Sequence, residues 1–197
     1  MTCDSRLSGQ IAFLVEADKL KTILRRTPLS DASRLENSAE HSWHLALAAI
    51  VLAEYAPADV DRLRVLELVT VHDLVEIDAG DTFAYDAGEL ETKADRERAA
   101  ADRVFGLLPA GQATRVRALW EEFEAQETIE ARVANALDRL QALLLNAASG
   151  GGSWGTHHVT RAQILRRMLP IERTLPALWP LVLETIDQFS AAGVIQA

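Results

Sequence analysis

The segment LELVTVHDLVEIDAGD, residues 66–81, places a histidine and an aspartate, His72 and Asp73, side by side in otherwise apolar surroundings. A buried carboxylate or imidazole costs several kcal/mol unless it is paired, hydrogen-bonded or bound to a cation. A metal ion would supply that compensation, and both side chains are ordinary metal ligands. A His-Asp pair by itself is often a surface contact or a satisfied core pair, so its meaning depends on the residues on either side.

Helical patterns lie on both sides of this segment. Apolar spacing predicts a helix over residues 11–25, Ser38 is placed to cap a helix over residues 39–55, and Asp59 is placed to cap one over residues 58–79. Five more helices are expected over residues 89–108, 109–123, 129–148, 159–168 and 175–189, the third capped by Thr128. His72 and Asp73 therefore fall on the third of about eight helices.

The composition agrees with an all-α fold. Leucine and alanine dominate the 197 residues, while aromatic residues make up only 6% and glycine-proline clusters are few. We predict a single compact helical bundle over residues 1–197, with core motifs within about residues 20–168 and the C-terminal helices of residues 159–192 packing on it. The apolar C-terminal segments either cover this core or pair two subunits.

Charge and cysteine usage exclude several classes of function. A formal charge of -9 argues against a polynucleotide partner, which needs a basic face, but leaves room for a small anion in a local cationic cleft. Cys3 is the only cysteine, so neither an intrachain disulfide nor a thiolate zinc site within one chain is expected. The chain shows no signal sequence and no membrane span, and we expect a cytoplasmic protein with no membrane partner.

Two further residues share the chemistry and the apolar helical context of the His-Asp pair. His41 lies upstream in AEHSWHLAL, and Asp138 lies downstream in VANALDRLQALLL. Arg139 is expected to compensate Asp138 only partly, because adjacent helical residues point about 100° apart. Two imidazoles and two carboxylates suit a divalent Mn, Co, Fe, Ni or Zn ion and leave positions open for water and substrate.

At these residues the chain resembles a known family. RLENSAEHSWHLAL, TVHDLVEIDAGDT and ANALDRLQALL are similar, in order and spacing, to the core motifs of HD-superfamily metal-dependent phosphohydrolases. The chain is most similar to the small group that includes the bacterial 5′-deoxynucleotidases. The resemblance implies an HD-domain bundle and one divalent metal ion per chain, with magnesium added to the metals above. It also implies a small phosphorylated substrate, which in that group is a nucleotide, and a homodimer.

The resemblance also assigns residues. The metal-ligand positions fall on His41, His72, Asp73 and Asp138. Glu76 matches an acidic residue beside the metal, placed to handle a proton because it lies on nearly the same helix face as His72, and Asp81 matches a further active-site acid. The alternative interpretation of Glu76 and Asp81 is that each is a carboxylate at a helix end or in a loop, exposed to water.

The phosphate-binding position of the family falls on Arg26. Its neighbour Arg25 is an alternative, and either arginine alternatively serves as an ordinary charge at a helix C-terminus. Thr27 stands where the deoxynucleotidases have an aromatic residue, which leaves the sugar preference open.

The predicted function is metal-dependent hydrolysis of nucleoside 5′-monophosphates by activated water. An alarmone-type pyrophosphohydrolase is a weaker alternative, because Ile77 follows Glu76 where that group has a second acid. No histidine lies between His72 and Asp138, which counts against a diiron oxygenase or a dinuclear phosphodiesterase. The non-enzymatic alternative is a sensor that binds metal and nucleotide without turnover.

Overall fold

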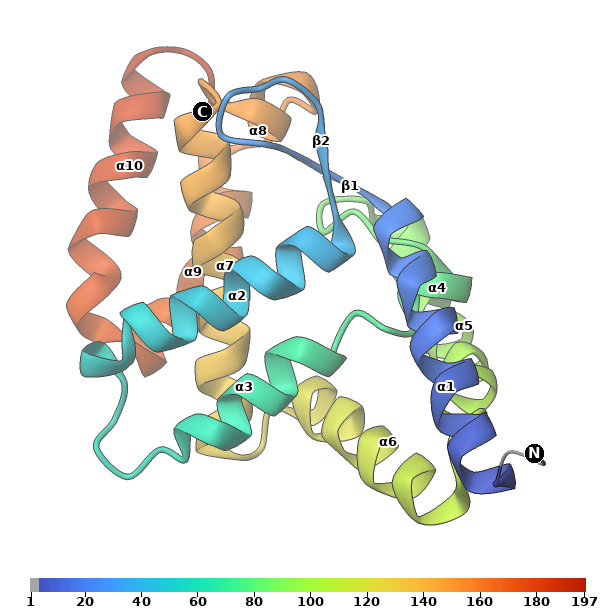
Figure 1. Ribbon diagram of the computed structural model, residues 1–197. Helices are drawn as coiled ribbons and strands as arrows, with labels where there is room; N and C mark the ends of the chain where they lie inside the picture. The colour runs from blue at the N-terminus through green and yellow to red at the C-terminus, as the bar shows by residue number, and fades with distance from the viewer. Residues whose placement is uncertain (1–3) are drawn as a thin grey trace.

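The computed structural model describes residues 4–197, apart from the side chains of residues 87, 89 and 90, and Cys3 lies outside the described residues. Its α-helices are α1 Ser5–Ala17, α2 Ser38–Val51, α3 Arg62–Val71, α4 Glu76–Ala79, α5 Ala87–Phe105, α6 Ala110–Ala125, α7 Ile129–Ala148, α8 Gly152–Thr156, α9 Arg161–Thr174 and α10 Trp179–Ala191 (Figure 1). Short 3₁₀ helices cover Asp18–Thr22, Ala53–Tyr55 and Pro176–Leu178. The strands are β1 Leu24–Pro28 and β2 Leu35–Asn37.

These elements confirm the all-α class. Within residues 4–197, eight of the ten α-helices are ten residues or longer, since only the four-residue α4 and the five-residue α8 are shorter. This agrees with the prediction of about eight helices. The one sheet in this part of the chain is the β1-β2 hairpin, which helical spacing did not predict.

Helix α7 is the centre of the fold, with α2, α3, α6 and α9 packed around it. Its 20 residues include a row of fully buried leucines, among them Leu137, Leu140 and Leu143. The Thr128 side chain accepts a hydrogen bond from the Ala131 N–H, which confirms the predicted cap. A long helix buried on most sides can hold polar residues in the interior only where other elements supply partners.

The C-terminal helices cover this centre. Ile164 and Ile171 of α9 and Val182 and Ile186 of α10 are fully buried in the same hydrophobic core as α7. Burying each large aliphatic side chain contributes about 1.5–3 kcal/mol. Residues of α9 and α10 are therefore part of the hydrophobic core of the chain.

The first predicted helix was wrong in its boundaries. Helix α1 ends at Ala17, and the chain continues through a 3₁₀ turn into β1, which pairs antiparallel with β2. Along β1 the buried residues are Arg25 and Thr27, an alternation typical of a strand. Local spacing could not show this, because the strand exists through pairing with residues about ten positions away.

The third predicted helix is interrupted. Helix α3 begins after Asp61, whose side chain caps it in place of Asp59, and it ends at Val71. Residues 72–75 form a turn before α4. The turn releases the side chains of the His-Asp pair from one fixed helical spacing, so they reach the same site from a bend.

The predicted cap of α2 was also wrong by one residue. Asn37 caps the helix and forms a capping box with Glu40. Ser38, the expected cap, is instead the first helical residue and is fully buried. Its hydroxyl is thereby available to another partner.

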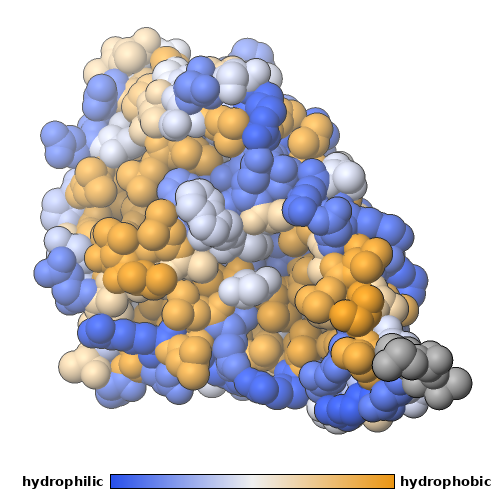
Figure 2. All heavy atoms as spheres, in the orientation of Figure 1, coloured by the Kyte–Doolittle hydropathy of each residue, from blue (hydrophilic) through white to orange (hydrophobic). Residues whose placement is uncertain are grey.

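Figure 2 shows apolar residues gathered on the surface over α1 and over α2. The exposed residues there are Leu7, Ile11, Leu14 and Val15 on α1 and Trp43, Leu47, Ile50 and Val51 on α2. None of the helices in the described residues has the length and apolar character needed to cross a membrane.

Candidate functional site

A cleft of about 310 Å³ opens where β1, the segment after α3, and helices α5, α6, α7 and α9 meet. Six of the seven residues predicted for the site line it: Arg26, His72, Asp73, Glu76, Asp81 and Asp138. The seventh, His41, is fully buried behind this wall. The structure thus brings together residues from four separate segments of the chain.

The two histidines and the first aspartate form the tightest group. One ligand atom from each of His41, His72 and Asp73 lies within 4.8 Å of the others. Asp138 lies beside this group of three, with its Oδ1 3.0 Å from His41 Nε2. In a metal site each ligand atom lies about 2.0–2.2 Å from the shared ion, so the ligand atoms are also close to one another. The grouping of these ligand atoms within 4.8 Å therefore fits a divalent metal.

The Nδ1 atoms of His41 and His72 contact oxygens that can only accept a hydrogen bond. His41 Nδ1 donates to Gln141 Oε1 at 3.0 Å, and His72 Nδ1 donates to the Val69 carbonyl at 3.0 Å. These bonds direct both Nε2 atoms toward Asp73 and Asp138. The His72 ring also rests against Phe123, with ring centroids 4.5 Å apart.

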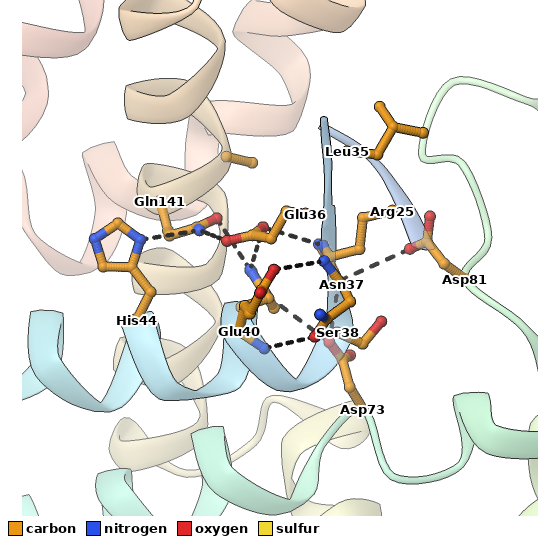
Figure 3. Close-up of polar contacts among 12 residues, drawn as sticks. Arg25, Leu35, Glu36, Asn37, Ser38, Glu40, His44, Asp73, Asp81 and Gln141 are labelled. Carbon is orange, nitrogen blue, oxygen red and sulfur yellow. Dashed lines mark hydrogen bonds and ion pairs between the residues drawn. The ribbon is translucent and has the colours of Figure 1, made fainter. Parts of the chain in front are cut away.

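A buried polar pair holds His41 from behind. Gln141 Nε2 donates to Glu36 Oε1 at 2.7 Å and also lies 3.2 Å from His44 Nδ1 (Figure 3). Both side chains are about 2% exposed. Sequence reasoning missed them, although Gln141 follows Asp138 by three positions and therefore shares its helix face.

Four carboxylates, Asp73, Glu76, Asp81 and Asp138, form what we call the carboxylate cluster, and Arg25 lies among them. The Arg25 guanidinium is 3.0 Å from Asp73 Oδ2 and 3.8 Å from both Asp81 Oδ1 and Asp138 Oδ1. Figure 3 shows it between Glu36, Asp73 and Asp81. Arg25 thus faces inward on β1, and Arg26 is exposed at the edge of the cleft.

The carboxylate cluster holds more negative charge than the neighbouring cationic groups stabilise. Burial raises the pKa of Asp73, but His72 and Arg25 overcome this and lower it to about 2. Burial and the neighbouring Asp73 raise the pKa of Glu76 well above its ordinary value. Burial likewise raises the pKa of Asp81, against the effect of Arg25. Carboxylates this close favour an added cation, an independent observation that fits a metal.

Asp138 and His41 share a proton-bearing contact. Burial raises the pKa of Asp138, but the His41 hydrogen bond and Arg139 hold it well below its usual range. Burial and Arg25 oppose protonation of His41, but its bonds to Asp138 and Glu36 raise its pKa to about 9. Arg139 Nη1 lies 2.6 Å from Asp138 Oδ2, so the expectation that these neighbours do not face each other was wrong: the long side chain folds back.

Glu76 reaches the cluster from the start of α4. The prediction of one continuous helix that carries both His72 and Glu76 was wrong. The Ser38 hydroxyl donates to Glu76 Oε2 at 2.6 Å. This contact gives the buried serine a hydrogen-bond partner and fixes the orientation of the Glu76 carboxylate.

Comparison with known proteins places these motifs in a family. A model of the HD domain matches residues 17–179. The chain belongs to the HD-domain family. The predicted resemblance is thereby confirmed, and the matched range contains His72 and Asp73.

Several relatives of this HD-domain protein have names. It is 30% identical to the mouse 5′-deoxynucleotidase HDDC2 over 145 residues, which cover 70% of each chain. It is 28% identical to the same-named protein from Xenopus laevis, over 73% of this chain and 70% of the relative, and 31% identical to the human one, over 61% and 60%.

Solved structures agree on the fold. The crystal structure of a predicted metal-dependent phosphohydrolase from Magnetospirillum magnetotacticum MS-1 is 50% identical, covers 98% of this chain and 100% of its own, and has a TM-score of 0.92. An HD-domain phosphohydrolase from Listeria innocua, 17% identical over 94% of this chain and 95% of its own, shares the fold with a TM-score of 0.63.

The HD-domain cleft also has an aromatic side, which sequence reasoning missed. Phe83 and Tyr85, on the loop after α4, contact each other edge to face with ring centroids 5.4 Å apart, and His157 lies 4.4 Å from Phe83. Both loop residues line the cleft. Aromatic faces of this kind stack readily on nucleobases.

Proposed function

We propose that the protein is a metal-dependent phosphohydrolase that removes the phosphate from nucleoside 5′-monophosphates. The observation that carries this is the buried group of His41, His72 and Asp73, with ligand atoms within 4.8 Å, beside a cleft that also holds arginines and aromatic rings. Relatives named 5′-deoxynucleotidase support a deoxynucleotide as the substrate.

One divalent ion per chain would be held by His41, His72, Asp73 and Asp138. The mixed nitrogen and oxygen donors suit Mn, Co, Fe, Ni or Zn, with Mg as a further candidate. When bound, such an ion lowers the pKa of a coordinated water and stabilises negative charge on a phosphate. Arg139, bonded to the second oxygen of Asp138, would keep that carboxylate oriented.

The remaining residues divide proton transfer and binding among them. Glu76, held by Ser38 and with a raised pKa, is placed to accept a proton from the attacking water and return it. Asp81 would position water or sugar at the rim of the carboxylate cluster. Arg26 would contact the phosphate from the edge of the cleft, since Arg25 is already engaged by carboxylates.

We also infer a homodimer and a cytoplasmic location. The exposed apolar residues of α1 and α2 support a second copy as partner. The cytoplasm is the compartment where a nucleotide substrate is available. Light scattering during gel filtration tests the dimer, and a mass of 21.6 kDa would contradict it.

The test of the function is phosphate release from a panel of deoxy- and ribonucleoside 5′-monophosphates. The protein is stripped with a chelator and restored with Co²⁺, Mn²⁺, Mg²⁺ or Zn²⁺. Turnover that falls by about a thousandfold or more in Asp73→Ala supports the proposal, because the ion contributes several kcal/mol. Asp95→Ala on the exposed surface of α5 is the matched control.

Failure of the panel would have a defined meaning. No phosphate release with any of the metals overturns the nucleotidase assignment. Tight metal and nucleotide binding without turnover would then favour the sensor, and release from other phosphomonoesters would keep the hydrolase but change its substrate.

A further inference from the structure

Helix α9 brings to the cleft an arginine that has no carboxylate partner within the described part of the chain. Arg167 lines the cleft wall and is only partly exposed, whereas its neighbour Arg166 is exposed on the outside of the helix. No hydrogen bond or ion pair engages Arg167 anywhere in residues 4–197 whose side chains are described. Arg139, another arginine that lines the cleft, is bound to Asp138.

The surroundings of Arg167 disfavour its charge. Burial and repulsion from Arg139 lower its pKa to about 10, and Asp138 offsets this only in part. The group remains charged at neutral pH, because that pKa lies well above 7. An anion that joins a partly desolvated guanidinium without an ion-pair partner is bound favourably.

A structural role does not account for this placement. Arginines that support the fold elsewhere have carboxylate partners, such as Arg64 with Glu67 and Glu122, and Arg161 with Asp187. The carboxylates near Arg167 are already committed, since Asp138 is bound by His41 and Arg139. The guanidinium therefore keeps its donors for a group that enters the cleft.

We propose that Arg167 binds the phosphate of the substrate from the α9 side of the cleft, beside Asp138. This rests on the proposed phosphohydrolase function. A phosphate offers two or more anionic oxygens, and the planar fork of a guanidinium matches two of them. Arg167 lines the same cleft as Asp138, one of the predicted metal ligands, so such a phosphate would enter the cleft that holds the predicted site.

The test measures binding of inorganic phosphate, the product, by calorimetry on the metal-loaded protein. We expect Arg167→Ala to weaken phosphate binding by about tenfold or more, as for the loss of a charge-assisted hydrogen bond. Arg166→Ala removes the same charge one residue away and should change binding less than about twofold. Metal content and melting temperature should match the parent in both variants.

Kinetics gives a second measurement. Arg167→Ala should raise the KM for a nucleoside monophosphate more than it lowers kcat. The KM of Arg167→Lys should lie between those of the parent and the alanine variant, because lysine keeps the charge but lacks the planar guanidinium fork. If the alanine variant does not fold, the lysine variant carries the test alone, and unchanged phosphate affinity in it overturns the proposal.

The two proposals fail differently. Phosphate affinity in Arg167→Ala equal to that of the parent overturns the role of Arg167 while leaving nucleotidase turnover intact. Absence of turnover in the parent, with phosphate binding that still depends on Arg167, overturns the phosphohydrolase and retains the anion site.

Discussion

The two sides of the cleft hold positive charge in opposite ways. On the β1 side, burial opposes the charge of Arg25, but Asp73 and Asp81 overcome this and raise its pKa. On the α9 side, burial and Arg139 lower the pKa of Arg167 to about 10. A guanidinium enclosed by carboxylates is satisfied within the protein, whereas one beside other guanidiniums still attracts an anion. In the proposed enzyme, this difference would separate a cation-binding side from a phosphate-binding side.

After Asp73→Ala, the largest effect expected on the carboxylate side comes from Glu76→Gln. The amide keeps an oxygen for the Ser38 hydroxyl but cannot accept a proton, so kcat should fall by about 10² to 10³ while the metal is retained. Single-turnover rates and metal analysis of the same sample measure the two quantities. Glu124→Gln, in the wall of the same cleft but outside the carboxylate cluster, should change neither by much. Equal loss of rate and metal in Glu76→Gln would refute the proton-transfer role.

The carboxylate side also predicts how the stability of the metal-free protein depends on pH. The folded pKa of His41 is raised from 6.5 to about 9, so its contribution is fully present below pH 6.5 and is lost as the pH rises to about 9. The raised pKa of Glu76 acts in the same direction above pH 4.5. The free energy of unfolding should fall by on the order of 3 kcal/mol for His41 between pH 6 and 9.

Urea unfolding of chelator-treated protein at pH 6, 7.5 and 9 measures this change. Metal-loaded protein is the comparison, and its stability should not fall over the same range, because the ion binds neutral imidazole and ionised carboxylate. The same decline in the free energy of unfolding of both forms would contradict the prediction, because the pH dependence would then not arise from the predicted metal ligands.

A smaller effect is expected behind the histidines. Gln141→Met keeps the side-chain volume but removes the Oε1 acceptor of His41 Nδ1 and the Nε2 donor to Glu36 Oε1. Metal affinity should weaken by about 10- to 100-fold, the usual effect of losing a group that orients a ligand. Gln188→Met, on the exposed surface of α10, is the control. Unchanged metal affinity would show that the Nδ1 bond does not set the orientation of His41.

The sequence was sufficient where the pattern is local. Thr128 and the long apolar periodicity after it predict α7, and that helix fixes Asp138 in the interior. The motif order then predicts which residues meet His72. Each of these inferences depends on spacing within one helix or on the resemblance of short motifs.

The missed features depend on pairing between distant segments. Leu20, Ile23 and Leu24 fit a helical spacing, yet β1 forms because Leu24 and Pro28 lie opposite Asn37 and Leu35. The strand turns Arg25 inward and leaves Arg26 exposed, a choice that helical periodicity cannot make. Arg167 was missed for the same reason, since only the packing of α9 on α7 brings it to the cleft.

The smallest effect is expected at Arg26, and it sharpens the contrast between the arginines. Its guanidinium is exposed at the edge of the cleft, where water competes for the same donors, and exposed ion pairs contribute about 0.2–1 kcal/mol. Arg26→Ala should therefore raise the KM for a nucleoside monophosphate by less than about fivefold, with kcat and metal content unchanged. Arg34→Ala, on the exposed pair with Glu40, controls for a general loss of charge near the hairpin. An effect larger than that of Arg167→Ala would reverse the order, because the exposed arginine would then supply more of the phosphate binding than the desolvated one.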